Sequence, residues 1–219
     1  FPVKFKGMHP NEIKFVPLEA KAEMTGRQIL SRHPTGRDYA HVCKDWDKFP
    51  IFIDNSGKIM SMPPIINSHL MGKIDQTTTE VFVESTGNDF NTVLKALIII
   101  VTALGDMGGK IYSIDCIQQN GKKAPVPDLT PEKMRLTIEN CKKLLGIDLK
   151  EKQVIGLLEK MGYNAKKIKQ GIEANVPAWR TDVLHEHDLI EDVAIAYGYD
   201  KFIPELPKIS TVGEEDSKE

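Results

Sequence analysis

A stretch near the middle of the chain, residues 118–128, separates two regions of different character. Its sequence, QQNGKKAPVPD, has no apolar periodicity and is rich in residues that favour turns and loops. Short apolar segments mix with helical patterns on both sides of it, without the regular strand–helix–strand alternation of an α/β protein. The sequence therefore predicts an α+β fold, with a first domain over residues 1–119 and a second over 120–207. We expect the charged segment 208–219 to be disordered or cut from a longer chain.

The first region predicts short strands mixed with helices. Residues 19–33 have a helical pattern in which Thr25 can act as the N-cap. Residues 51–62 form a predicted hairpin, because two apolar segments flank the turn-forming sequence NSG. The long apolar run 90–104 predicts a largely buried helix.

The second region predicts two short helices followed by a hairpin. The first helix begins at Thr130, where a capping residue precedes a proline, and it ends at Gly146. The second helix ends at Gly162, and the hairpin turns at Gly171. This order is typical of a winged-helix or helix-turn-helix unit. The basic patch KKIK, residues 166–169, fits a solvated strand face better than contact with RNA phosphates.

Composition limits the functions open to the chain. The 219 residues are 41% hydrophobic and 27% charged, as in ordinary globular proteins, and the formal net charge of −2 gives no overall basic surface for nucleic acid. The three cysteines, Cys43, Cys116 and Cys141, lack the spacing of a disulfide framework or a zinc site, which indicates a reducing compartment. The longest apolar run is too short to span a bilayer, and no signal-peptide pattern opens the sequence. We therefore expect a cytoplasmic protein without membrane contact.

Residues 176–199 carry a dense group of acidic side chains. Asp188, Glu191 and Asp192 lie at positions i, i+3 and i+4 of a predicted helix, and Asp182 lies in the segment that leads into it. A hard cation with oxygen ligands, such as Mg²⁺, is one way to offset the repulsion between these charges. Alternatively, Asp188 and Glu191 form an acidic capping box at the start of the helix. The spacing leaves both interpretations open.

Two histidines among these acids, His185 and His187, suggest zinc as another alternative. Alternate residues on a helix point in different directions, however, and the neighbouring oxygen ligands suit magnesium better. Magnesium is therefore the preferred metal.

Small polar residues lie next to the predicted strands of the first region, among them Ser61, Asn67, Glu84 and Thr86. No nucleophile elbow, zinc-protease, P-loop or dinucleotide motif accompanies them. From the residues alone the simplest interpretation is structural, with Thr86 and Asn88 capping the helix that follows.

Several motifs resemble those of phenylalanyl-tRNA synthetase beta subunits. Near the end of the second region, WRTD is followed after five residues by DLIED and then by AYGY, and this pattern resembles the B5 domain of that family. The first region contains GRDYAHVCKDWDKFPIFIDNSGKIMSMPPIINS and VFVESTGND, which resemble the B3/B4 domain in its archaeal and eukaryotic cytosolic form. The similarity covers nearly the whole chain. It implies a mixed-sheet B3/B4 domain followed by a small winged-helix-like B5 domain.

The resemblance also implies two sites. The carboxylates that match the family's magnesium ligands are Asp182, Asp188, Glu191 and Asp192. The residues that match the family's editing pocket, which takes a tyrosine- or phenylalanine-type ligand, are Phe52, Ser61, Glu84 and Thr86.

Each residue of the implied pocket has an expected role. Phe52 would shape the pocket, at a position that is often Leu in the family. Glu84 would recognise the tyrosine hydroxyl, at a position that is often Asp. Ser61 and Thr86 would orient water or the terminal ribose of the tRNA.

The implied function is that of a fragment of an enzyme. By resemblance, the whole synthetase is a cytosolic heterotetramer of alpha and beta subunits that joins phenylalanine to tRNA(Phe) with ATP and Mg²⁺. The fragment would hydrolyse tyrosyl-tRNA(Phe) as a proofreading step, with the tRNA 3′ end in the B3/B4 pocket and B5 near the alpha subunit. Two alternatives stay open: a non-catalytic module for assembly and tRNA placement, and a free-standing deacylase.

Overall fold

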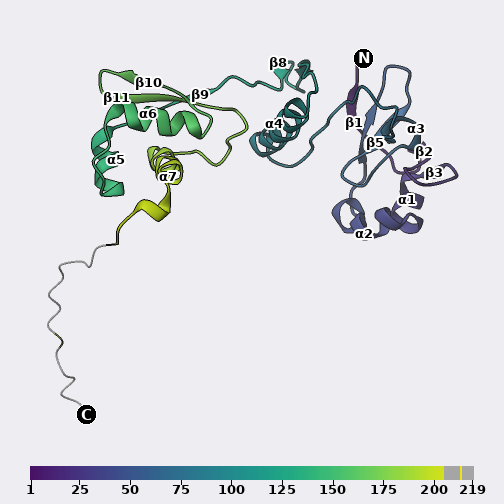
Figure 1. Cartoon of the computed structure of the whole chain (residues 1–219). Coiled ribbons are helices and arrows are strands. Elements are labelled where there is room, and N and C mark those ends of the chain that lie inside the picture. The colour runs from purple at the N-terminus through teal and green to yellow at the C-terminus, as the bar shows by residue number, and fades with distance from the viewer. Residues whose placement is uncertain (205–212, 214–219) are drawn as a thin grey trace, which may run out of the picture. The chain divides into compact units, whose positions relative to one another are not determined.

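Short antiparallel strands and helices alternate irregularly along the chain (Figure 1), which confirms the α+β prediction. The computed structural model describes residues 1–204 and 213. It divides into two compact units, Phe1–Val93 and Leu94–Glu219. The expected domain boundary at 119/120 stays a prediction. The expected tail over 208–219 lies outside the described residues, apart from Gly213.

The first unit is built on a four-stranded sheet in the order β1-β4-β5-β6. Its strand pairs are all antiparallel, unlike the mixed sheet that the resemblance implies, because each strand after β4 returns through a short connection. Its strands are β1 (Lys4–Met8), β4 (Phe49–Ile53), β5 (Ile59–Met62) and β6 (Ile66–Asn67). Along β4, Phe49, Ile51 and Ile53 are buried in the core, so Phe52 lies on the opposite face of the sheet. Strands β4 and β5 form the hairpin that the sequence predicts over residues 51–62.

A second strand pair and three helices complete the first unit. Its remaining elements are β2 (Lys14–Phe15), which pairs with β3 (Met24–Thr25), α1 (Gly26–Arg32), α2 (Pro34–Cys43) and α3 (His69–Gly72). Thr25 caps α1 as expected: its hydroxyl accepts from the Gln28 N–H at 3.2 Å, and the Gln28 side chain accepts from the Thr25 N–H at 2.9 Å. This capping box starts the helix later than the predicted range 19–33. Gly36 allows α2 to pack closely on α1, because a Cβ there would lie 1.9 Å from the Ile29 carbonyl oxygen.

Helix α4 (Phe90–Asp106) spans the boundary between the two units. The Asp89 carboxylate caps it by accepting a hydrogen bond from the Thr92 N–H at 2.7 Å. Of its own residues only Ile98 and Val101 are buried, so the predicted helix forms but is not largely buried. Neither α4 nor any other helix in the described part of the chain is long and apolar enough to cross a membrane.

The stretch expected to be a linker contains a strand. In the second unit β7 (Ile114–Ile117) pairs antiparallel with β8 (Lys123–Val126), and Gly121, with a φ of 79°, lies in the turn between them. Residues 123–126 are extended because of this pairing, which the local sequence does not reveal.

The main core of the second unit joins a three-stranded antiparallel sheet to three helices. The sheet has the order β10-β11-β9, and the elements are β9 (Glu132–Leu136), β10 (Asn164–Ile168), β11 (Gly171–Val176), α5 (Ile138–Leu145), α6 (Glu151–Lys160) and α7 (Glu186–Tyr197), followed by a 3₁₀ turn, η1 (Tyr199–Lys201). In β11, the alternating residues Ile172, Ala174 and Val176 are buried. Leu158 of α6 and Leu189 of α7 pack in the same core.

The predicted helix from Thr130 to Gly146 is wrong in its first half. Residues 132–136 form β9, because they pair along their whole length with β11. The helix begins only at α5, where the Thr137 hydroxyl accepts a hydrogen bond from the Asn140 N–H at 3.3 Å. It ends as predicted at Gly146, whose φ is 69°. Two helices followed by a hairpin are therefore present, and the winged-helix assignment stays a prediction.

A carboxylate connects the starts of α5 and α7. Glu186, the first residue of α7, accepts hydrogen bonds from the Thr137 N–H at 2.7 Å and from the Asn140 side chain at 2.8 Å. Burial raises the pKa of Glu186, but these hydrogen bonds outweigh it and lower the pKa below its ordinary value. The ionised side chain thus stabilises the position of α7, on which the acidic residues are placed.

Candidate functional site

Side chains from four strands form a row across the face of the first sheet that is opposite its core. The strand register pairs Phe5 with Phe52, Phe52 with Ser61, and Ser61 with Asn67. Directly paired residues of antiparallel strands point to the same face of a sheet. The row therefore changes from aromatic on β1 and β4 to polar on β5 and β6.

Two residues of the segment after α3 contact this row. The Ser61 hydroxyl donates a hydrogen bond to Glu84 at 2.8 Å. The Phe82 ring lies edge-on to the Phe52 ring, with 6.3 Å between centroids, and Phe52 in turn lies 4.7 Å from Phe5. The structure thus brings together three of the four residues expected in the pocket, Phe52, Ser61 and Glu84.

The carboxyl group in this cluster is perturbed by its surroundings. Burial raises the pKa of Glu84 above its ordinary value of 4.5, and the hydrogen bond from Ser61 partly opposes this effect. Ser61 itself is only 4% exposed. The cluster offers a hydrogen-bonding carboxyl at the end of an aromatic surface, an arrangement that suits a ligand with a hydroxylated aromatic ring.

Thr86 does not join the cluster. Its side chain is exposed and makes no hydrogen bond to any residue in the described part of the chain. The alternative role as a helix cap does not apply either, because Asp89 caps α4 in place of Thr86 or Asn88. Its expected role in the pocket stays a prediction.

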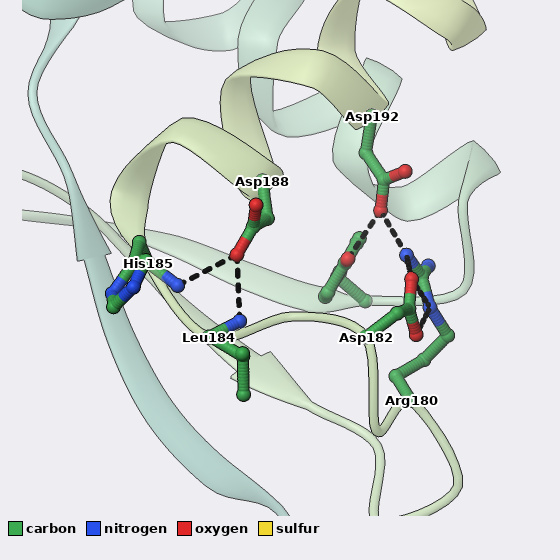
Figure 2. A network of polar contacts seen from close by, with 7 residues as sticks. Arg180, Asp182, Leu184, His185, Asp188 and Asp192 are labelled. Atoms are coloured by element: carbon green, nitrogen blue, oxygen red, sulfur yellow. Dashed lines mark hydrogen bonds and ion pairs between the residues drawn. The ribbon is translucent and has the colours of Figure 1, made fainter.

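In the second unit, an arginine lies among the expected metal ligands (Figure 2). The Arg180 guanidinium binds Asp182 through two parallel hydrogen bonds, of 2.9 Å from Nε and 2.8 Å from Nη2. The same Nη2 lies 2.7 Å from Asp192, whose carboxylate also accepts a hydrogen bond from the Tyr163 hydroxyl. Arg180 lowers the pKa of Asp182, and the hydrogen bond from Arg180 to Asp182 is the main reason why the pKa of Arg180 is raised.

The other two expected ligands, Asp188 and Glu191, form no hydrogen bond with Arg180. Asp188 accepts hydrogen bonds from the backbone N–H groups of Leu184 and His185, both at 2.7 Å, and these bonds lower its pKa (Figure 2). Asp188 thus caps the start of α7 from the third helical position, with His185 as the N-cap. The alternative prediction of a capping box between Asp188 and Glu191 is therefore wrong in its partners. Glu191 is exposed and joins none of these contacts.

The side-chain positions do not form a metal site as they stand. Within residues 1–204 and 213, no three His, Cys, Asp or Glu side chains are arranged to hold a metal ion. Asp182, Asp188 and Asp192 instead have protein donors as partners. Magnesium binding therefore stays a prediction, and the residues do not fit the ion without rearrangement.

Several contributors escape a search by sequence alone. Arg180 stands in the WRTD motif, but its second partner, Asp192, is 12 positions away. Tyr163 lies 29 positions from Asp192 and reaches it from the loop between α6 and β10. Phe5 and Phe82 belong to the aromatic surface only because of strand pairing and tertiary contact.

Comparisons with known proteins agree with this architecture. A family model described as the tRNA synthetase B5 domain matches residues 134–199. The phenylalanine–tRNA ligase beta subunit of Thermococcus kodakarensis is 40% identical over 215 residues, which are 98% of this chain and 37% of that protein. The corresponding subunit of Thermococcus sibiricus is 37% identical over 98% of this chain and 38% of its own length.

A solved structure gives the same result. The crystal structure of an N-terminal fragment of the phenylalanyl-tRNA synthetase beta subunit from Pyrococcus horikoshii matches with a TM-score of 0.84 and 38% sequence identity. The match covers 91% of this chain and 57% of that one. The chain spans less than two fifths of the length of the two curated relatives. It belongs to the family of phenylalanine–tRNA ligase beta subunits, as the homologue of a segment of them.

Proposed function

We propose that the first unit carries the editing pocket of a phenylalanine–tRNA ligase beta subunit and removes tyrosine from mischarged tRNA(Phe). The observation that supports this most directly is the hydrogen bond between Ser61 and Glu84 beside the ring of Phe52. A tyrosine side chain needs an apolar surface for its ring and a hydrogen-bond partner for its hydroxyl. Phe52 on β4 supplies the first feature, and Glu84 in the segment after α3 supplies the second.

Selectivity follows from the cost of covering the second oxygen of Glu84 without a hydrogen-bond donor, because Ser61 donates to only one of the two. Glu84 is partly buried, so a ligand that enters must replace the contacts that it displaces. A site built to bind a hydroxyl rejects the analogue without it by about 10⁴–10⁵-fold. Phenylalanyl-tRNA(Phe), the correct product, would therefore escape hydrolysis.

The hydrolytic step requires little from the protein. An aminoacyl ester is already activated, so positioning of a water molecule against its carbonyl provides much of the acceleration. The Ser61 hydroxyl, which is fixed by its hydrogen bond to Glu84, is suited to hold that water or the terminal ribose. The tRNA 3′ end is thus the proposed partner of this face.

The proposal also assigns the remaining properties of the relatives. The complete protein would pair with an alpha subunit in a heterotetramer and take part in ATP-dependent ligation of phenylalanine to tRNA(Phe). The second unit would contribute contacts to that subunit or to the tRNA. A non-catalytic role in assembly and tRNA placement is the competing function, and the position of Thr86 outside the cluster favours it.

Deacylation assays separate the two functions. Tyrosyl-tRNA(Phe) and phenylalanyl-tRNA(Phe) are incubated with the complete synthetase and with this chain, each as the parent and as the Ser61→Ala and Glu84→Ala variants. Glu80→Gln, which changes an exposed acid of the same segment, is the matched control. Tyrosine-selective hydrolysis by the complete synthetase that both variants lose and Glu80→Gln keeps supports editing. Equal rates for the parent and Glu84→Ala synthetases would refute it in favour of the assembly role.

A further inference from the structure

The acidic group around α7 already contains a positive charge, the guanidinium of Arg180. We propose that Arg180 is the cation that neutralises Asp182 and Asp192, so that the second unit folds without a divalent metal ion. This inference is independent of the proposed editing function, because it concerns a different unit of the chain.

The geometry of Arg180 matches its two partners. Its Nε and Nη2 atoms face the two oxygens of Asp182 at 2.9 and 2.8 Å, the bidentate arrangement that suits a planar guanidinium. The same Nη2 reaches Asp192 at 2.7 Å. One arginine thus bridges the segment before α7 to the helix itself, as Figure 2 shows.

Burial makes this partnership necessary for Asp192. The residue is only 4% exposed, and a buried carboxylate without a partner is costly. Tyr163 donates to the same carboxylate oxygen, and its ring lies 5.3 Å from the guanidinium carbon. A hydrogen-bonded network therefore connects Tyr163, Arg180 and Asp192, and each charged group in it has a partner.

A magnesium ion bound by Asp182 and Asp192 would have to replace their hydrogen bonds with Arg180. Mg²⁺ requires oxygen ligands in near-octahedral geometry at short distances. The carboxylate oxygens of Asp182 and Asp192 instead accept hydrogen bonds from Arg180. Asp188 would also have to leave the N–H groups of Leu184 and His185. The guanidinium is already part of the chain, so it fills the cationic role without the binding of a separate ion.

Urea unfolding of this chain with and without Mg²⁺ tests the inference. In a Trp46→Phe background, Trp179 is the single remaining tryptophan and reports on the second unit. Unfolding midpoints are measured in excess EDTA and in millimolar Mg²⁺ for the parent, Arg180→Gln, Arg180→Lys and Glu191→Gln. Lys169→Gln, which changes an exposed lysine of the same unit that pairs with no described acidic residue, is the control for loss of a positive charge.

The expected result is a parent midpoint that is the same in EDTA and in Mg²⁺. Arg180→Gln lowers the midpoint in both solutions, and Arg180→Lys lowers it less. Glu191→Gln and Lys169→Gln leave it unchanged. If Mg²⁺ raises the parent midpoint and Glu191→Gln abolishes that rise, a metal held by the carboxylates is the cation and the inference is wrong. An Arg180→Gln midpoint equal to that of the parent would also overturn it.

Discussion

Replacement of Tyr163 by phenylalanine isolates one contact of the buried carboxylate. The change removes a single oxygen atom and keeps the ring, which is 3% exposed in the core of the second unit and lies against Arg180. What is lost is the hydrogen bond from the hydroxyl to Asp192. Asp192 keeps its ion pair with Arg180, so the carboxylate loses one of its two partners and retains the other.

The structure gives the expected size of this effect. Hydrogen bonds to charged groups contribute about 1.5–3 kcal/mol net, and the remaining arginine places this one in the lower part of that range. We expect Tyr163→Phe to lower the free energy of unfolding of the second unit by about 2 kcal/mol, which is roughly a 30-fold change in the unfolding equilibrium. The urea dependence of that free energy should not change, because the surface exposed on unfolding is nearly the same.

Urea unfolding followed by Trp179 fluorescence, in the Trp46→Phe background, measures this loss. Tyr197→Phe is the matched control, because its hydroxyl makes no hydrogen bond to any described residue although its ring packs against the same core. A double-mutant cycle with Asp192→Asn then tests the mechanism, since the cost of Tyr163→Phe should fall when the carboxylate is gone. An unchanged midpoint for Tyr163→Phe, or the same cost in both backgrounds, would refute the role assigned to the hydroxyl.

Four further outcomes follow from the structure. Burial raises the pKa of Glu84 in the folded state, so this carboxyl contributes to stability below its ordinary pKa of 4.5. The contribution is lost as the pH rises through the raised pKa. Glu84→Gln should remove this part of the pH dependence of thermal unfolding. Glu186→Gln should lower the free energy of unfolding by about 1 kcal/mol, because it weakens the hydrogen bonds with Thr137. This loss should shrink as the pH falls through the lowered pKa of Glu186. Chemical denaturation at two pH values measures the difference. Gly146→Ala should cost about 1–2 kcal/mol because its φ is 69°. In the same denaturation assay, Gly156→Ala in helix α6 should stabilise the protein by about 0.5–1 kcal/mol, since an added Cβ meets no atom within 4 Å there. A greater stability for Gly146→Ala than for Gly156→Ala would contradict the argument from backbone conformation.

Local patterns predicted those parts of the fold that local interactions determine. The Thr25 cap, the hairpin over residues 51–62 and the helix end at Gly146 depend on residues close in sequence, and all three are present. The helix predicted over residues 132–136 is wrong, because their extended form comes from pairing with β11. Strand β8 was missed for the same reason, since only its pairing with β7 makes it extended.

The candidate sites divide in the same way. The pairing of Phe52 with Ser61 follows from the hairpin, which a sequence pattern can reveal. The contact between Ser61 and Glu84 joins positions 23 apart and depends on the path of the intervening chain. Around α7, the sequence shows the charges of the carboxylates. It does not show that Arg180 contacts Asp192, because that contact depends on the packing of α7.

The alternation of β4 separates two kinds of evolutionary constraint. Its inward residues, Phe49, Ile51 and Ile53, fill the core, whereas Phe52 on the other face belongs to the candidate pocket. A substitution at Phe52 can therefore alter the size of a ligand that fits without opening a cavity in the interior. A change of side chain at this position thus acts on the candidate pocket and leaves the packing of the core intact.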